Sequence, residues 1–92
     1  MTNRTRTEIM SEILRVAYEG SATKTKIMYQ AFLSYGQMKE YLVVLTRNSL
    51  INYDTYTQTF KTTEKGLRFL DAYNQMDQII KEQQIHIEGE KP

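Results

Sequence analysis

Apolar residues recur at helical spacing in the middle of the chain, directly after a signal that starts helices. Ser34 followed by Gln37 forms a capping box, which predicts a helix that begins at Tyr35 and ends near Asn48. One face of this helix is apolar at positions i, i+3, i+4 and i+7, which hold Met38, Tyr41, Leu42 and Leu45. The pattern therefore predicts a helix with one buried side and one free side.

Two further helices are predicted upstream. A second capping box, Thr5 with Glu8, predicts a helix over about residues 6–19. Thr23 or Thr25 is the expected cap of a shorter helix, whose apolar residues are Ile27, Met28, Ala31 and Phe32. The break that follows has the length of the turn between two crossed helices, as in a helix-turn-helix.

A β-hairpin is predicted downstream. Residues 50–53 and 58–62 are rich in aromatic and β-branched side chains, and residues 54–57 can connect them. The connection contains no glycine, so we expect a loop longer than a tight two-residue turn. A hairpin in this place is the wing of a winged helix-turn-helix, and it makes the helix from Tyr35 the recognition helix.

A long last helix is predicted from Thr62 or Thr63, as its cap, to about Gln84. It carries a stripe with the a/d spacing of a coiled coil, made of Phe69, Tyr73, Met76, Ile80, Gln83 and Ile87. The first half of the stripe has a second interpretation, as cover for the core of the domain. The second half lies beyond that core, since a helix rises about 1.5 Å per residue. The same helix of a second copy is the simplest cover for it.

These elements predict a mainly α fold with a small β-hairpin: a winged helix-turn-helix followed by a long C-terminal dimerisation helix. The expected organisation is a DNA-binding domain over residues 1–62, a coiled-coil dimerisation helix over residues 63–87 and a frayed tail over residues 88–92. A chain of 92 residues buries only a modest share of its surface, so a dimer would help to stabilise it.

Composition argues against several other classes of protein. The chain has no cysteine, which excludes disulfides and thiolate chemistry. The single histidine, His86, lies near the C-terminal tail without positioned partners, and the glycines form no phosphate-binding loop. We expect no enzyme, no metal, no cofactor and no small-molecule substrate. The apolar runs are too short for a membrane span and no signal peptide is evident, so a cytoplasmic, nucleoid-associated location is expected.

Charge is unevenly placed along the chain, although the net charge is only +1. Up to Arg47, seven basic residues stand against four acidic ones, whereas five basic residues face seven acidic ones in the remainder. The basic half is the half with the predicted helix-turn-helix. This asymmetry favours a nucleic acid as the partner of the N-terminal half.

The free side of the recognition helix carries residue types that read DNA. Val43 can contact a thymine methyl group, Gln37 can pair with adenine, and Lys39 and Arg47 can bind phosphate or guanine. The alternative is an ordinary solvated face, on which Gln37 serves only as a cap and Glu40 repels phosphate. Val44, beside Val43, also belongs to the predicted free side.

Other basic and aromatic residues are candidate contacts outside this helix. Lys24 and Lys26 precede or open the helix that crosses the DNA backbone in this motif, although each alone is better explained as a surface lysine. Tyr56 and Lys61 are the candidate contacts of the wing, unless Tyr56 folds back on the hairpin. Near the N-terminus, Arg4 and Arg6 are candidates for a flexible basic arm.

Three motifs occur together in these elements: Lys26-Ile27-Met28-Tyr29, Leu33-Ser34-Tyr35 and Thr63-Glu64-Lys65-Gly66. With them, the chain resembles the small archaeal winged-helix DNA-binding proteins that dimerise through an antiparallel coiled coil of their C-terminal helices. The resemblance covers residues 8–84. It implies a homodimer that presents two recognition helices to double-stranded DNA. The residues that it places in or beside the recognition region are Lys26, Ser34, Tyr35, Gln37 and Lys39.

The sequence therefore favours double-stranded DNA binding by a homodimer, as a transcriptional regulator or as a chromatin-type architectural protein. The competing interpretation is a winged helix that docks to proteins of the transcription machinery without direct DNA contact. In that case the exposed valines would be its apolar anchor. The two interpretations differ in the salt dependence of binding, because only phosphate contacts release counterions.

Overall fold

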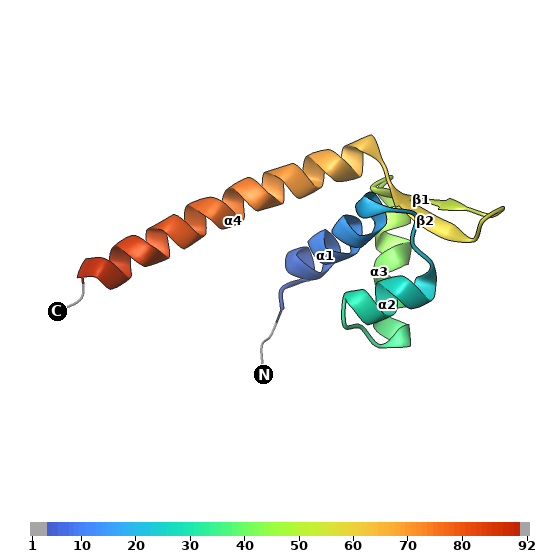
Figure 1. The fold of residues 1–92 in the computed structure, drawn as a ribbon, viewed down its shortest axis with the longest axis horizontal. Coiled ribbons are helices and arrows are strands. Elements are labelled where there is room, and N and C mark those ends of the chain that lie inside the picture. Colours follow the sequence, from blue (N-terminus) through green and yellow to red (C-terminus); the bar gives the residue numbers. More distant parts are fainter. Residues whose placement is uncertain (1–3, 91–92) are drawn as a thin grey trace.

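The computed structural model describes residues 4–90, and it describes side chains for residues 4–82. Its elements follow the predicted order: α1 (Arg6–Glu19), α2 (Lys24–Gln30), α3 (Tyr35–Arg47), β1 (Ile51–Asp54), β2 (Thr59–Thr62) and α4 (Glu64–Glu90). Figure 1 shows α1, α2, α3 and the hairpin gathered at one end, with α4 leaving this domain as a single long helix. The molecule is therefore elongated, with extents of 58 × 29 × 20 Å.

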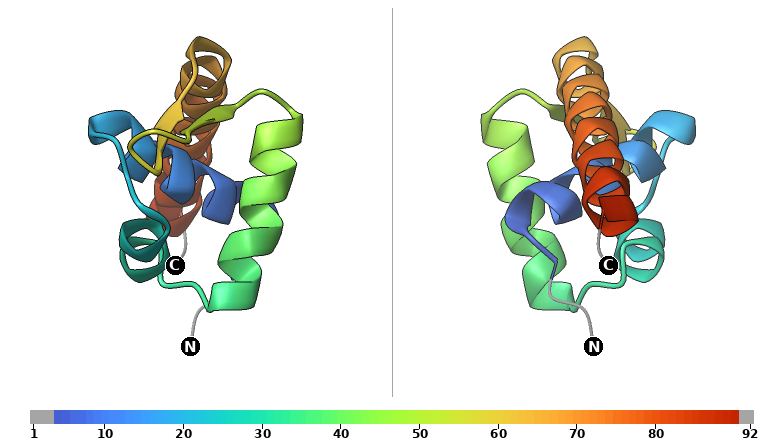
Figure 2. Two further views of the ribbon diagram at one scale, coloured as in Figure 1. Left: turned by 90° about the vertical axis from the view of Figure 1, so that its right-hand side faces the viewer. Right: turned by 90° about the vertical axis from the view of Figure 1, so that its left-hand side faces the viewer.

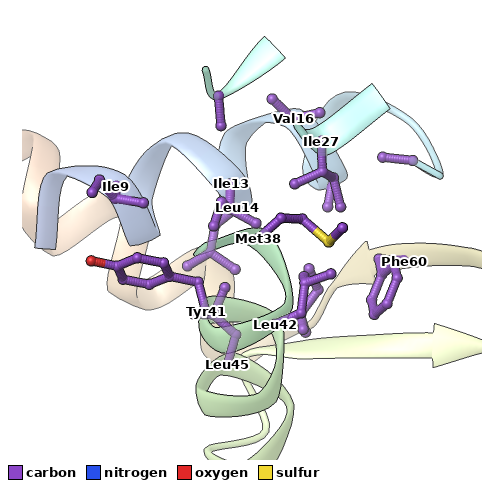
Figure 3. Packing of buried hydrophobic residues seen from close by; sticks show 14 of the residues in the cluster. Ile9, Ile13, Leu14, Val16, Ile27, Met38, Tyr41, Leu42, Leu45 and Phe60 are labelled. Carbon is purple, nitrogen blue, oxygen red and sulfur yellow. The ribbon is translucent and has the colours of Figure 1, made fainter. Parts of the chain in front are cut away.

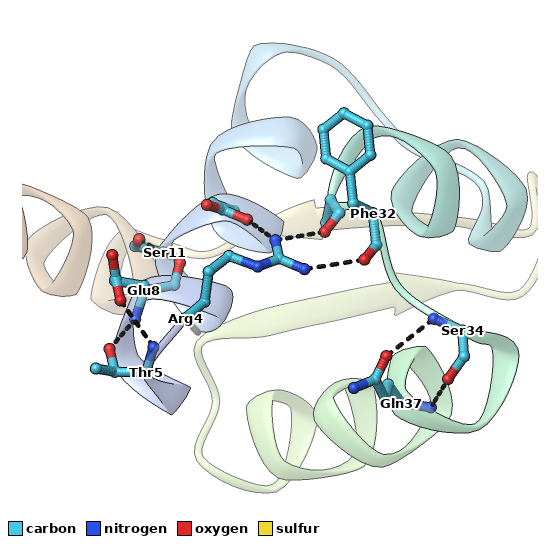
Figure 4. A network of polar contacts seen from close by, with 9 residues as sticks. Arg4, Thr5, Glu8, Ser11, Phe32, Ser34 and Gln37 are labelled. Carbon is cyan, nitrogen blue, oxygen red and sulfur yellow. Dashed lines mark hydrogen bonds and ion pairs between the residues drawn. The ribbon is translucent and has the colours of Figure 1, made fainter. Parts of the chain in front are cut away.

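Side-chain caps start the helices where the sequence predicts. Thr5 Oγ1 accepts from the Glu8 amide at 3.0 Å, and Glu8 Oε1 accepts from the Thr5 amide at 2.7 Å (Figure 4). Ser34 and Gln37 exchange the same pair of bonds at 3.2 and 3.0 Å. Thr23, rather than Thr25, caps α2. Both predicted capping boxes are therefore confirmed.

The inner side of α3 forms the centre of the core (Figure 3). All of its predicted apolar positions are buried: Met38, Tyr41, Leu42 and Leu45. They pack in one cluster with Ile13 and Leu14 of α1, Ile27 of α2 and Phe60 of β2. Burial of each aliphatic side chain stabilises the fold by roughly 1.5–3 kcal/mol, so this cluster fixes which side of α3 faces outward.

Helices α2 and α3 end without the glycine that commonly follows a helix. The residue after the C-cap is Phe32 in α2 (φ 55°) and Ser49 in α3 (φ 59°). Both adopt the left-handed conformation, which is unfavourable for residues other than glycine. The next amide then reaches back into the helix, from Leu33 to the Met28 oxygen and from Leu50 to the Leu45 oxygen, both at 2.9 Å. Each of these bonds satisfies a carbonyl in the last turn of its helix.

The sequence predicts that Phe32 belongs to the apolar face of α2. This prediction is wrong, because α2 ends at Gln30. Its side chain is 81% exposed. Arg4 holds the backbone at this place, since its guanidinium donates to the Ala31 oxygen at 2.6 Å and to the Phe32 oxygen at 2.9 Å. The same guanidinium pairs with Glu12 (Figure 4).

The prediction of a flexible basic arm is therefore wrong for the two arginines concerned. Arg4 is bound to the turn between α2 and α3, and the Arg6 guanidinium lies 5.2 Å from the centroid of the Tyr41 ring. Both contacts join residues far apart in the sequence, so local sequence pattern does not reveal them.

The hairpin pairs β1 with β2 in antiparallel register, from Ile51 opposite Thr62 to Asp54 opposite Thr59. The connection spans residues 55–58 and is longer than a two-residue turn, as predicted. Leu50, the predicted first residue of the strand, instead bonds to the end of α3 and accepts from the Thr63 amide at 3.1 Å. The strand therefore starts one residue later.

Ala22, which lies between α1 and α2, extends this small sheet. Ala22 donates its amide to the Phe60 oxygen at 3.0 Å and accepts from the Phe60 amide at 2.7 Å. The Ala22 side chain is buried in the core. The link is thus a paired segment that anchors β2 to the helices.

The start of α4 is bonded to the end of α3. Thr63 Oγ1 accepts from the Gly66 amide at 2.9 Å and donates to the Ser49 oxygen at 2.7 Å. Lys65 Nζ donates to the Asn48 oxygen at 2.9 Å, where the carbonyl end of α3 favours a cation. The Thr-Glu-Lys-Gly motif therefore fixes where the long helix leaves the domain.

Helix α4 continues to Glu90, past the predicted end near Gln84. No glycine or proline occurs between Leu67 and Glu88, so nothing in that stretch breaks a helix. The predicted frayed tail over residues 88–92 thus begins inside the helix, and residues 91–92 lie outside the described part of the chain.

Candidate nucleic-acid interface

The outward side of α3 is open to solvent along its whole length. Tyr35 is 58% exposed and Val43 is 49% exposed, and Lys39 and Arg47 are exposed on the same side. Figure 2 shows α3 along one flank of the molecule, with α2 beside one of its ends and the hairpin at the other. Val44 is half-buried, so the prediction of two exposed valines holds for Val43 alone.

The N-terminal turn of α3 is ordered by side chains that were predicted to contact DNA. The Ser34 hydroxyl and the Gln37 amide oxygen are both engaged in the capping box. The Lys39 ammonium lies 5.5 Å from the centroid of the Tyr35 ring, within the range of a cation-π interaction. This contact keeps the Lys39 charge on the outward side of the first turns of α3.

A hollow of about 390 Å³ lies between α3 and the hairpin. We name it the α3–hairpin hollow; its lining residues are Lys24, Lys39, Leu42, Val43, Thr46, Arg47, Tyr53 and Phe60. The Tyr53 and Phe60 rings, with centroids 4.6 Å apart, form its hairpin side. The structure thus brings together four of the predicted contact residues, Lys24, Lys39, Val43 and Arg47.

Other predicted contact residues lie away from this hollow. Lys26 is exposed on α2 but does not line it. Lys61 lines a second hollow, together with Asp54 of the hairpin and Ser21, which lies between α1 and α2. Tyr56 is 95% exposed in the hairpin loop, so it does not fold back on the hairpin. The Asp54 carboxylate orders this loop by accepting from the Tyr56 amide at 2.8 Å.

Four lining residues of the α3–hairpin hollow do not stand out in the sequence as contact residues: Leu42, Thr46, Tyr53 and Phe60. A signal for Thr46 exists, because it lies three residues after Val43 on one helix face. Tyr53 and Phe60 face each other across the hairpin, a pairing that depends on the exact register of the strands. Sequence pattern leaves that register open.

The stripe on α4 divides into a packed half and an open half. Phe69 packs against the core and Tyr73 is half-buried. Farther along, Met76 is 58% and Ile80 52% exposed, and Ile79 beside them is 63% exposed. The side chains of Gln83 and Ile87, the last two predicted members, lie outside the described residues.

The packed half of the stripe faces acidic residues of α1. Partial burial, and then the Glu8 carboxylate, raises the pKa of the Tyr73 hydroxyl above its ordinary value. Asp77 and Glu12 act in the same direction, whereas the Ser11 hydroxyl opposes them. Tyr73 is therefore a neutral side chain at physiological pH, suited to packing between helices.

Two other kinds of site are absent from the described residues. No group of three metal-ligating side chains comes together within this part of the chain. None of its helices combines the length and apolar composition that crossing a bilayer requires. His86 lies beyond the residues whose side chains are described.

Comparison with known proteins gives matches over most of the chain. The family model of the winged helix-turn-helix matches residues 3–81, from before α1 into α4. An uncharacterized protein of Methanocaldococcus jannaschii is 30% identical over 77 residues, which cover 84% of this chain and 77% of that protein. Among solved structures, Sso10a-2, a DNA-binding protein from Sulfolobus solfataricus, is similar with a TM-score of 0.83 and 26% identity. That match covers 94% of this chain and 92% of Sso10a-2.

Proposed function

Because this chain belongs to the winged helix-turn-helix family, we propose that it binds double-stranded DNA through the outward side of α3. The observation that carries the proposal is the open face of α3, on which Lys39 and Arg47 flank the exposed Val43. Within residues 4–82 no carboxylate lies within 4.0 Å of either cation. Their charges are therefore available to phosphate. The similarity to Sso10a-2, a DNA-binding protein, supports the same partner.

In this proposal the cations position the protein and α3 reads the bases. Lys24, Lys39 and Arg47 surround the α3–hairpin hollow and contact phosphates, with Lys26 on the flank of α2. Val43 and the side-chain NH2 group of Gln37 face the base edges, while the Gln37 amide oxygen stays in the capping box. Ser34 and Tyr35 shape the helix start, and Tyr56 and Lys61 in the wing reach the neighbouring backbone.

We further propose that two copies associate through α4. The exposed Met76, Ile79 and Ile80 form an apolar stretch beyond the domain, which a second α4 would cover. Helix α4 has 27 residues, so it is about 40 Å long at 1.5 Å per residue. A dimer through this helix would hold two recognition helices well apart, which suits both a regulator and a nucleoid-associated architectural protein.

Titration of a labelled duplex at several salt concentrations tests the proposal. If each domain neutralises about four phosphates, log affinity falls with log salt with a slope near −3.6 per domain. Binding to a protein partner through Val43 and its apolar surroundings gives no such slope. Absence of duplex binding at low salt contradicts the proposal and favours the protein-interaction module.

Selection of bound duplexes from a random pool distinguishes a sequence-specific regulator from an architectural protein. Enrichment of one sequence supports base reading by Gln37 and Val43, because phosphate contacts carry no sequence information. Recovery of an unenriched pool with retained affinity supports the architectural role. The selection is run at two salt concentrations, so that specific and non-specific binding separate.

A further inference from the structure

We propose that the α3–hairpin hollow binds a small organic anion with an aromatic body, of the class of aromatic carboxylates. Its volume of about 390 Å³ lies within the range typical of small-molecule sites, roughly 300–1,000 Å³. The hollow opens on the same face of α3 that we propose for DNA. Occupation by such a ligand therefore regulates the proposed function.

The floor and the hairpin side of the hollow are apolar. Leu42 and Val43 come from α3, and Phe60 comes from β2. Tyr53 and Phe60 hold their rings 4.6 Å apart at an interplanar angle of 45°, which presents a rigid aromatic surface. A flat ring placed here contacts aromatic and aliphatic side chains at once, and it removes apolar surface from water.

The rim of the hollow is cationic. Lys24, Lys39 and Arg47 line it, and none of its lining residues is acidic. Since no carboxylate of residues 4–82 lies within 4.0 Å of these cations, an anion entering the hollow displaces no existing ion pair in that part of the chain. The charge of the rim therefore favours an anionic group such as a carboxylate, and the apolar floor favours the ring to which it is attached.

The second hollow, on the other side of the hairpin, has the opposite character. It is lined mainly by hydroxyl and amide side chains, and its lining includes the acidic Asp54 as well as Lys61. An aromatic anion finds neither an apolar floor nor unopposed cations there. This contrast gives the proposal its specificity for the α3–hairpin hollow.

The regulatory part of the inference rests on the proposed function. Lys39 and Arg47 cannot bind a phosphate of DNA and the carboxylate of a ligand at the same time. A ligand in the hollow also covers Val43. Ligand and duplex are therefore expected to compete, each lowering the apparent affinity of the other.

Binding is tested on the ¹⁵N-labelled full chain by titration with three probes, followed through its amide chemical shifts. The probes are 2-naphthoate, the neutral 2-naphthamide and acetate. We expect 2-naphthoate to give saturable shifts in residues 39–47 and in Tyr53 and Phe60, and 2-naphthamide to bind at least about tenfold more weakly because it lacks the charge. Equal affinity for naphthoate and naphthamide, or naphthoate shifts confined to α4, overturns the proposal. Saturable binding of acetate at equal strength overturns the role of the apolar floor.

Val43→Glu supplies the mutational test, because it places a negative charge in the hollow at a solvent-exposed helical position. The matched control is Gln75→Glu, which adds the same charge on the exposed surface of α4. We expect Val43→Glu to weaken 2-naphthoate binding by about tenfold or more, and Gln75→Glu to leave it unchanged. Amide spectra establish that both variants are folded, and equal weakening in the two variants overturns the proposal.

Competition with a labelled duplex separates this inference from the proposed function. Binding of 2-naphthoate in the hollow together with absent duplex binding contradicts the proposed function and leaves the ligand site intact. Duplex binding without any 2-naphthoate binding overturns the ligand site alone. Where both bind, release of duplex by 2-naphthoate, but not by 2-naphthamide at the same concentration, is the expected result. Simultaneous binding without mutual effect overturns the regulatory part.

Discussion

The α-carbon of Gly66 stands so close to Leu50 that a β-carbon on residue 66 would lie 2.1 Å from the Leu50 carbonyl oxygen. A β-carbon there would also lie 2.7 Å from Thr62 Cγ2. The first turn of α4 is therefore packed directly on the backbone that joins α3 to β1. This contact, together with the bonds of Thr63 and Lys65, sets the direction in which α4 leaves the domain.

Gly66→Ala should destabilise the fold, because the neighbouring carbonyl is part of the backbone and cannot rotate away. We expect a loss of about 1–3 kcal/mol in the free energy of unfolding, the usual cost of overpacking. Gly36→Ala is the matched control, since a β-carbon at residue 36 meets nothing within 4 Å. Thermal unfolding followed by circular dichroism should show a lower midpoint for Gly66→Ala only. Equal midpoints for the two variants would contradict the packing described.

Arg4→Ala tests whether the N-terminal arginine is structural. The change removes two hydrogen bonds to carbonyls of the turn between α2 and α3, and it leaves Glu12 without its partner. Since the Arg4 side chain is only 23% exposed, we expect a loss of about 1–3 kcal/mol in denaturant unfolding. The control Arg15→Ala removes an exposed side chain of α1 whose one hydrogen bond, to Asn74 Oδ1, is long at 3.4 Å, so it should change stability by less than about 0.5 kcal/mol. An unchanged stability of Arg4→Ala, combined with weaker DNA binding, would restore the basic-arm interpretation.

The sequence predicts those parts of the fold that depend on neighbouring residues. Capping boxes join residues three apart, and the buried side of α3 follows from helical spacing, so local sequence pattern is enough to predict both. The exposed positions of Lys39, Val43 and Arg47 follow from the same periodicity. Local pattern therefore predicts α3 and most of its free side, and the exception is Val44, which is half-buried.

The features that the sequence does not predict depend on contacts between distant segments. Arg4 bonds to Ala31 and Phe32, and Gly66 accommodates Leu50, across separations at which local pattern carries no information. The end of α2 is obscured because Phe32 occupies a conformation for which glycine is the usual signal. The α3–hairpin hollow depends on the register of the strands as well as on the face of α3. Only its α3 side is therefore visible in the sequence.

The double substitution Lys39→Ala with Arg47→Ala should weaken duplex binding and reduce its salt dependence. If each cation neutralises one phosphate, the slope of log affinity against log salt becomes less negative by about 1.8 per domain. The control is the pair Arg68→Ala with Lys81→Ala, which removes the same charge from exposed positions of α4. Fluorescence anisotropy of a labelled duplex measures both slopes. An unchanged slope in the first double variant would reject the role assigned to Lys39 and Arg47.

Ile80→Asp should convert the proposed dimer into a monomer. Ile80 is 52% exposed in the single chain, and a charge at this position would be buried without a partner if a second α4 covered it. Gln78→Asp places the same charge on the opposite side of α4, because residues two apart are about 200° apart around a helix. Light scattering after size-exclusion chromatography gives the mass of each variant. If Ile80→Asp remained a dimer, the interface would have to lie on another surface.

The most direct test of DNA binding by α3 is the change in amide chemical shifts of the ¹⁵N-labelled chain when a short unlabelled duplex is added. The account predicts that the largest changes fall on the outward positions of α3 between Tyr35 and Arg47, with smaller changes at Lys24 and in the hairpin loop around Tyr56. Changes confined to α1 or α4, with the amides of α3 unaffected at saturating duplex, would contradict it.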